Sequence, residues 1–201
     1  MSTAVSAKDV KALRDATGAG MMDCKHALQE SGGDVEEAMK ALRAKGLADA
    51  QKRAGRAANE GLVHSYIHTG GRVGVLVEVN CETDFVARTD VFGTFVHDVA
   101  LHVAAMRPEF VSADDIPEAY VEGERAIFIE QAKDVPEHAR EKAVEGKLRK
   151  HLSTVTLLEQ EFVRDQNEKK ARTIEDLRTE IASELGENIT IRRFVLFELG
   201  S

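Results

Sequence analysis

The stretch GLVHSYIHTGGRVGVLVEVN, residues 61–80, constrains the fold more than any other part of the chain. Gly70 and Gly71 separate two runs rich in β-branched and aromatic residues, which is typical of a β-hairpin. Alternation in the second run places four valines on one face of a strand: Val73, Val75, Val77 and Val79. After a short loop, apolar residues recur at helical spacing, and we expect that helix to pack on the valine face: Phe92, Phe95, Val96, Val99 and Val103.

The remainder of the chain supplies further helices and one more strand. The closing NITIRRFVLFELG, residues 188–200, has the composition of a strand, and helices are expected on both sides of Pro136 and over residues 173–185. Mixed extended structure is expected over residues 152–163. A three-stranded sheet covered by helices is an α+β fold. Such a small sheet has exposed edges, which invite pairing with another chain.

The first 55 residues predict a separate module of three short helices and a connector, followed by an α+β core over residues 56–201. Capping-box patterns begin the first and third helices, at Ser6 and Asp34, and the second helix is expected over residues 21–30. Gly46 is the expected C-terminal cap of the third helix. Because a unit this small buries little surface, we expect it to dock on another part of the chain or on a partner.

Composition excludes several classes of protein. Acidic residues outnumber basic ones by 35 to 27, for a net charge of −8, whereas nucleic-acid-binding proteins usually need a basic surface. No apolar run approaches the roughly 20 residues of a membrane span, and the N-terminus has no apolar signal core. Two distant cysteines suit a reducing compartment. The sequence therefore favours a cytoplasmic protein-binding protein or an enzyme, with no direct nucleic-acid or membrane partner.

Enzyme and metal motifs are weak. Gly18-Ala19-Gly20 begins like a dinucleotide fingerprint, but no strand precedes it and the third glycine is missing. His64 and His68 on one strand would lie roughly 13 Å apart, too far to share a metal ion. Acidic neighbours would suppress the thiolate of Cys81, although a Cys81-dependent enzyme remains an alternative. We predict no catalytic residue, no metal site and no cofactor.

The loop VNCETDFVART, residues 79–89, leaves several interpretations open from its residues alone. Thr83 and Asp84 suit the start of a helix, as an N-cap and a first-turn acid. Phe85 could fold back on the core, contribute to an active site, or press into another protein. For Met22, helical periodicity favours a place in the core.

Four ordered segments resemble the bacterial elongation factor Ts family: TGAGMMDCKHAL (17–28), GDVEEAMKALR (33–43), VEVNCETDFVAR (77–88) and RRFVLFELG (192–200). The resemblance extends over essentially the whole chain. It implies that residues 1–55 form a module of the ubiquitin-associated type, followed by a small antiparallel sheet packed with helices. Longer family members carry two related core units and an inserted coiled coil. Short members, which this chain resembles, form homodimers, so the resemblance implies a homodimer here.

The same resemblance implies a guanine-nucleotide exchange factor that acts on elongation factor Tu, in its GDP-bound and nucleotide-free forms, without covalent catalysis. In the family, an acid–aromatic tip enters the nucleotide-binding domain of elongation factor Tu, wedges between two helices and disturbs the bound magnesium ion. The matching positions here are Thr83, Asp84, Phe85 and Val86. A second contact is implied for the N-terminal module, at Arg14, Met21, Met22 and Lys25. A simple adaptor, the remaining alternative, would need only residues 1–55.

Overall fold

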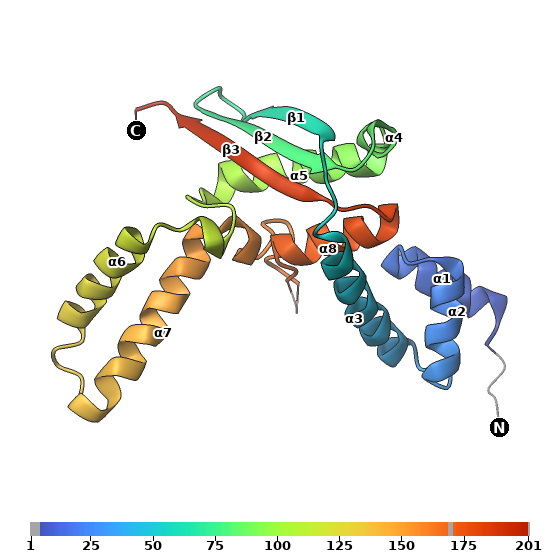
Figure 1. The fold of residues 1–201 in the computed structure, drawn as a ribbon, viewed down its shortest axis with the longest axis horizontal. Helices are drawn as coiled ribbons and strands as arrows, with labels where there is room; N and C mark the ends of the chain where they lie inside the picture. Colours follow the sequence, from blue (N-terminus) through green and yellow to red (C-terminus); the bar gives the residue numbers. More distant parts are fainter. Residues whose placement is uncertain (1–4, 169–170, 201) are drawn as a thin grey trace. The chain divides into compact units, whose positions relative to one another are not determined.

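The computed structural model describes residues 5–168 and 171–200, and it confirms the α+β class (Figure 1). The N-terminal helices are α1 (Ala7–Thr17), α2 (Met21–Glu30) and α3 (Val35–Arg53). The sheet consists of β1 (Glu60–Ile67), β2 (Val73–Cys81) and β3 (Thr190–Glu198). The other helices are α4 (Asp84–Ala87), α5 (Asp90–Met106), α6 (Glu118–Gln131), α7 (Glu137–Val155) and α8 (Ile174–Leu185). Short 3-10 turns lie at Ala113–Asp115 and Leu157–Glu159.

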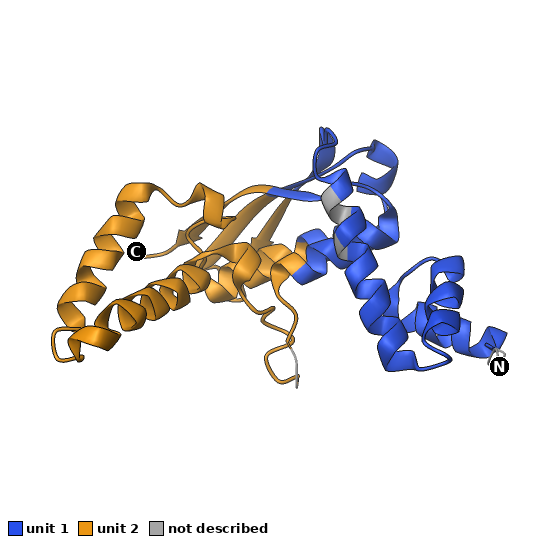
Figure 2. Ribbon diagram, turned by 60° about the horizontal axis from the view of Figure 1, so that its bottom comes forward, with its two compact units in different colours: residues 1–63, 78–96, 176–191 blue, residues 64–77, 97–175, 192–201 orange. Residues whose placement is uncertain are grey.

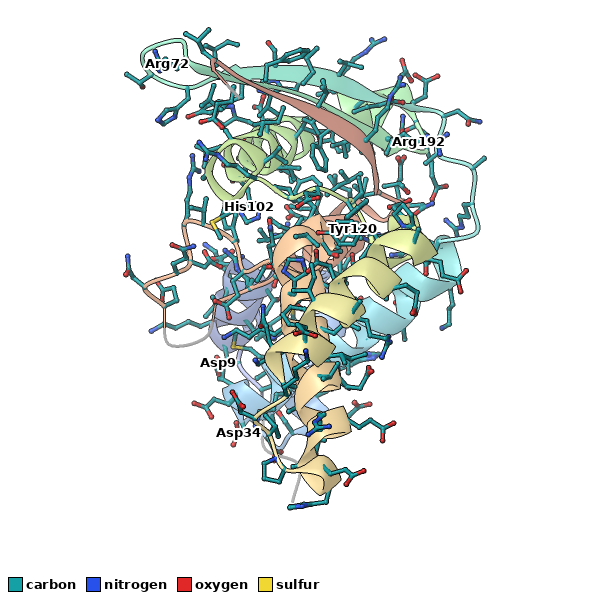
Figure 3. All side chains as sticks on the ribbon, turned by 90° about the vertical axis from the view of Figure 1, so that its left-hand side faces the viewer. Asp9, Asp34, Arg72, His102, Tyr120 and Arg192 are labelled. Atoms are coloured by element: carbon teal, nitrogen blue, oxygen red, sulfur yellow. The ribbon has the colours of Figure 1, made fainter. Side chains whose placement is uncertain are left out.

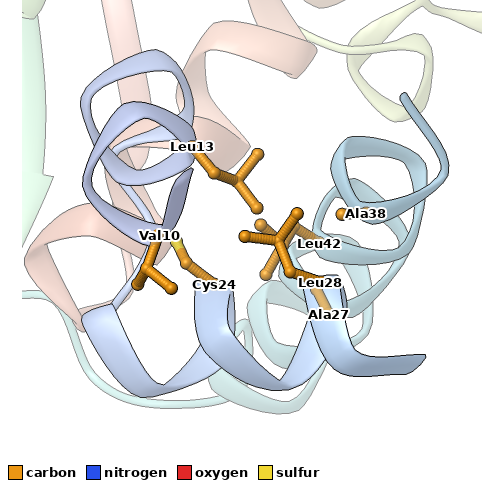
Figure 4. Packing of buried hydrophobic residues seen from close by; sticks show 7 residues of the cluster. All are labelled: Val10, Leu13, Cys24, Ala27, Leu28, Ala38 and Leu42. Carbon is orange, nitrogen blue, oxygen red and sulfur yellow. The ribbon is translucent and has the colours of Figure 1, made fainter. Parts of the chain in front are cut away.

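The N-terminal helices begin where their caps predict. The Ser6 hydroxyl accepts a hydrogen bond from the backbone of Asp9, and the Asp34 carboxylate accepts one from the backbone of Glu37. Gly18, at φ 67°, ends α1 in the left-handed conformation that glycine adopts without strain. Side chains from all three helices form one small buried cluster (Figure 4): Val10, Leu13, Cys24, Ala27, Leu28, Ala38 and Leu42.

The prediction that Gly46 ends the third helix is wrong, because α3 continues to Arg53. A Cβ atom at Gly46 would lie 3.5 Å from the Ser183 hydroxyl oxygen of α8, an ordinary contact distance, so α3 lies beside α8 at this position. Further along α3, the Arg53 guanidinium donates to the Ala182 carbonyl oxygen over 3.3 Å. Contact with α8 therefore supports the last turns of α3, which local capping rules would have ended earlier.

The sheet has the order β1-β2-β3, with β2 in the centre. Leu199 donates its backbone N–H to the Arg72 carbonyl oxygen, so the end of β3 lies beside the start of β2, as antiparallel strands require. Three of the alternating valines are buried, as predicted: Val75, Val77 and Val79. Gly61 in β1 has φ 144°, and a Cβ atom there would lie only 2.1 Å from the Val79 carbonyl oxygen. Only glycine fits this crossing.

The later helices follow the sequence pattern with one exception. Pro136 separates α6 from α7 as expected and lies immediately before the first residue of α7. Extended structure was expected from residue 152, but α7 continues to Val155 because its apolar face is still buried there. In the described part of residues 156–173, extended structure is limited to two isolated bridges, between Phe110 and Thr156 and between Glu161 and Thr173.

The chain divides into two compact units, each built from several segments (Figure 2). One unit comprises residues 1–63, 78–96 and 176–191, and therefore contains the N-terminal helices and the acid–aromatic loop. The other comprises residues 64–77, 97–175 and 192–201. A domain boundary between residues 55 and 56 stays a prediction.

Candidate protein-binding site

The acid–aromatic loop forms a short helix, α4, whose two faces differ sharply. Val86 and Ala87 are buried, and they fasten the turn to its own unit. Asp84 and Phe85 point outward, and 78% of the Phe85 surface is exposed. The interpretation in which Phe85 folds back on the core is therefore wrong. An outward-facing phenylalanine next to a carboxylate offers a partner both an apolar ring and a charge.

Local hydrogen bonds explain why these residues form a turn. Thr83 is extended (φ −129°, ψ 151°), and its hydroxyl oxygen accepts a hydrogen bond from the Val86 N–H over 3.3 Å. This confirms the expected N-cap. Thr89 closes the turn by donating its hydroxyl to the Val86 carbonyl oxygen over 2.8 Å, and it then accepts from the Phe92 N–H at the start of α5. On the outer face, the Asp84 carboxylate forms a 2.8 Å ion pair with Arg88.

Two residues far along the chain hold the base of this loop, and sequence reasoning missed both. The Glu187 carboxylate accepts hydrogen bonds from the backbone N–H groups of Glu82 and Thr83, over 2.9 Å and 3.1 Å, and from the Thr83 hydroxyl over 2.6 Å. Asn188 donates its backbone N–H to the Glu82 carboxylate over 2.7 Å. The available signal was modest: a polar pair, Glu187-Asn188, placed between a helix and a strand.

The four residues predicted for the N-terminal contact are all exposed: Arg14, Met21, Met22 and Lys25. Periodicity favoured a core position for Met22, but 58% of its surface is exposed, so that expectation is wrong. Arg14 and Met21 line an open, mostly polar hollow of about 950 Å³, together with the turn at Gly18 and with Glu184 of α8. This module therefore presents a mixed apolar and charged surface to solvent.

Cys81, the candidate nucleophile, lies at the end of β2 and is fully buried. Burial raises the pKa of the Cys81 thiol to about 11, with a further contribution from the nearby Glu187 carboxylate. The thiol therefore stays protonated near neutral pH, and its Sγ donates to the Thr83 carbonyl oxygen over 3.2 Å. Its role here is structural, as a small buried residue beneath the loop.

A histidine of β1 meets a histidine of α5, a pairing that sequence spacing could not predict. His64 of β1 and His97 of α5 meet, with His64 Nε2 3.2 Å from His97 Nδ1. Burial, and secondarily the His97 charge, lowers the pKa of His64. Over residues 5–168 and 171–200, no three His, Cys, Asp or Glu side chains gather as a metal site would require.

The outward face of the sheet is a second exposed apolar area. Ile67, Leu76 and Phe197 lie there beside a shallow hollow of about 550 Å³, and Leu199 also contributes to its lining. Apolar side chains standing together on a sheet surface commonly mark a protein contact. In the part of the chain that the structure describes, no helix is long and apolar enough to cross a membrane.

Fold and surface together define an α+β protein that carries an exposed acid–aromatic turn on a hydrogen-bonded loop and an exposed helical module. A sequence model of the family "Elongation factor TS" matches residues 2–171. The chain is 54% identical over 198 residues to elongation factor Ts of Thermoanaerobacter sp. (strain X514), covering 98% of this chain and 95% of that one. It is 52% identical to elongation factor Ts of Syntrophobacter fumaroxidans, with both chains covered completely.

A third relative is longer. Elongation factor Ts of Thermosynechococcus vestitus is 59% identical over 199 residues, which are 98% of this chain and 66% of that protein. The chain belongs to the elongation factor Ts family, and it covers nearly the full length of the first two relatives named above. Elongation factor Ts is the nucleotide exchange factor of elongation factor Tu and is not an enzyme.

Proposed function

We propose that this chain releases GDP from elongation factor Tu in the cytoplasm by inserting the turn Thr83–Val86 near the magnesium and nucleotide site. The observation that carries this proposal is the 78% exposure of Phe85 on a turn that is capped by Thr83 and anchored by the buried Val86 and Ala87. An exposed aromatic ring on a held backbone loses little conformational entropy when it enters a partner.

The residues of the turn divide into two roles. Phe85 supplies apolar area, and Asp84 brings a negative charge to the region of the magnesium ion, where it can reorganise the water shell or repel phosphate. Thr83 and Val86 hold the turn, through the N-cap hydrogen bond and through burial. No covalent step is needed, because a factor that binds the nucleotide-free partner better weakens GDP binding by the same ratio.

The energetics call for a second contact. A thousandfold weakening of GDP binding corresponds to about 4 kcal/mol of coupling. Burial of one phenylalanine contributes roughly 1.5–3 kcal/mol. We therefore propose that Arg14, Met21, Met22 and Lys25 bind the same nucleotide-binding domain at another place. Exposed methionines are adaptable enough to suit such a surface.

The test is release of a fluorescent GDP analogue from elongation factor Tu. We expect wild type to accelerate release and the double variant Asp84→Ala, Phe85→Ala to do so at least roughly sevenfold less, from the apolar area of Phe85 alone. Equal rates for both proteins would place the exchange surface elsewhere. If residues 1–55 supply only an adaptor surface, wild type would bind elongation factor Tu without accelerating release.

We also propose that two copies of this chain pair through the outward apolar face of the sheet. Sequence reasoning pointed to the sheet edges, whereas the exposed side chains of Ile67, Phe197 and Leu199 favour the face. Sedimentation of wild type and of Phe197→Asp tests this proposal. Wild type should sediment as a dimer and the variant as a folded monomer, and a monomeric wild type at tens of micromolar would refute it.

A further inference from the structure

The four-residue helix α4 has too few residues to be ordered by its own hydrogen bonds. Helix formation has a costly nucleus, and isolated helices of even a dozen residues are marginal in water. Because Asp84 and Phe85 both point outward, neither holds the turn through burial. Order in the proposed binding turn therefore has to come from its surroundings.

Val86 and Ala87 anchor the turn by burial, and one carboxylate accepts three hydrogen bonds at its base. Glu187 Oε2 accepts from the backbone N–H groups of both Glu82 and Thr83, while Oε1 accepts from the Thr83 hydroxyl. The same hydroxyl oxygen accepts from the Val86 N–H. A continuous series of hydrogen bonds thus runs from Glu187 through Thr83 into the first turn of α4. Hydrogen bonds to an ionised acceptor are the stronger kind.

The carboxylate is itself held in place by the segment that carries it. The next residue, Asn188, is buried, and it donates its backbone N–H to Glu82 over 2.7 Å. Its side-chain amide donates to the Arg56 carbonyl oxygen over 2.9 Å. Residues 82–83 donate hydrogen bonds to Glu187, and Asn188 donates one to Glu82. A change in the position of Glu187 would therefore break several hydrogen bonds.

We infer that Glu187 is a positioning residue for exchange: it holds the Asp84–Phe85 turn in its binding conformation before elongation factor Tu arrives. This inference rests on the proposed function of that turn. If only a fraction of free molecules has the turn ordered, the apparent affinity falls by that fraction. Once bound, the partner itself holds the turn, so the maximal release rate is unchanged.

The kinetic test follows GDP release against the concentration of the factor for wild type, Glu187→Ala and Glu187→Gln. For Glu187→Ala we expect the half-saturating concentration to rise about tenfold, with the maximal rate within about twofold of wild type. Glu187→Gln keeps an acceptor oxygen and should fall between the two. The matched control is Glu141→Gln, which removes one exposed carboxylate from α7 and should behave as wild type.

A second measurement separates positioning from general stability and does not involve the partner. In Glu187→Ala, amide hydrogen exchange should accelerate about tenfold at Thr83 and Val86 and stay unchanged at Val75, in the centre of the sheet. Equal protection at Thr83 in both proteins, or an unchanged half-saturating concentration, would overturn the inference. So would a lower maximal rate at unchanged half-saturation.

The two proposals fail in different ways. If the Asp84→Ala, Phe85→Ala variant releases GDP as fast as wild type, the proposed function of the turn is wrong. The amide exchange of Thr83 still decides, in that case, whether Glu187 orders the turn. If the double variant is slow but Glu187→Ala is not, the turn acts in exchange and needs no positioning by Glu187.

Discussion

Replacement of Phe85 by alanine should separate stability from exchange. With 78% of its surface exposed, Phe85 makes few contacts within its own chain, so we expect the free energy of unfolding to change by at most about 0.5 kcal/mol. The exposed part remains available to a partner. Scaled by the 78% exposure of Phe85, the roughly 1.5–3 kcal/mol for a buried phenylalanine becomes roughly 1.2–2.3 kcal/mol. That range corresponds to a loss of roughly 7- to 45-fold in exchange efficiency.

Phe92 offers the matched control. It is fully buried in α5, seven positions further along the chain, so the same change from phenylalanine to alanine should destabilise the protein by roughly 3–5 kcal/mol. The assay pairs urea unfolding with stopped-flow release of fluorescent GDP from elongation factor Tu. Exchange efficiency is taken from the slope at low factor concentration, where affinity and maximal rate both count.

Two results would refute this reasoning. A loss of more than about 2 kcal/mol of stability in Phe85→Ala would mean that the ring is packed against the chain in solution. An exchange efficiency within twofold of wild type would mean that the ring does not enter the partner.

Three further predictions concern residues away from the proposed turn. Burial lowers the pKa of His102 (labelled in Figure 3), whose Nδ1 accepts from the Val163 N–H while Nε2 lies 2.9 Å from the Gln160 side-chain oxygen. Below about pH 6.5 the unfolded chain therefore binds a proton at His102 more readily than the folded chain, so neutral His102 contributes stability above that pH, and this contribution is lost as the pH falls through the lowered pKa. An NMR titration of His102 should show a midpoint below about 6.5, and a midpoint above about 6.5 would contradict the lowered pKa. Gly46→Ala should raise the free energy of unfolding by up to about 1 kcal/mol, measured by thermal unfolding, because Gly46 is helical and has room for a methyl group. A lower free energy of unfolding would indicate that Gly46 has the left-handed conformation of a helix C-terminal cap. Cys81, buried and with a pKa of about 11, should resist iodoacetamide at pH 7.5 in the folded protein, as mass spectrometry would show. Rapid modification would mean that the thiol is accessible in solution.

Much of the fold could be read from local patterns. The capping residues Ser6 and Asp34 mark the helix starts because a side-chain oxygen and the following backbone N–H groups are near neighbours in sequence. Alternating valines identify β2 because side chains on a strand point to opposite faces in turn. Two local signals misled: Gly46 suggested a helix end, and periodicity placed Met22 in the core. Gly46 lies beside Ser183 of α8, and Met22 faces solvent, and neither fact can be read from the residues of its own helix.

The candidate site shows the same division. Thr83 could be recognised as an N-cap from its neighbours, and the resemblance to a family pointed to Asp84 and Phe85. Whether Phe85 points outward could not be decided by spacing, because a four-residue helix has no periodicity to read. Val86, grouped with the tip in sequence, is buried and serves to anchor it.

The sequence by itself determined the class of fold, the positions of most helices and strands, and the family, because these depend on periodicity, caps and ordered motifs within short stretches. The tertiary structure decided which distant groups meet. Glu187 reaches Thr83 across 104 positions, and His64 reaches His97 across 33. A carboxylate has no local preference for a partner so far away, and Glu187 reaches the loop because it lies just before β3, which pairs with β2 in the sheet. The hydrogen bonds from Glu82 and Thr83 to Glu187, which hold the proposed exchange turn, therefore exist only in the folded chain.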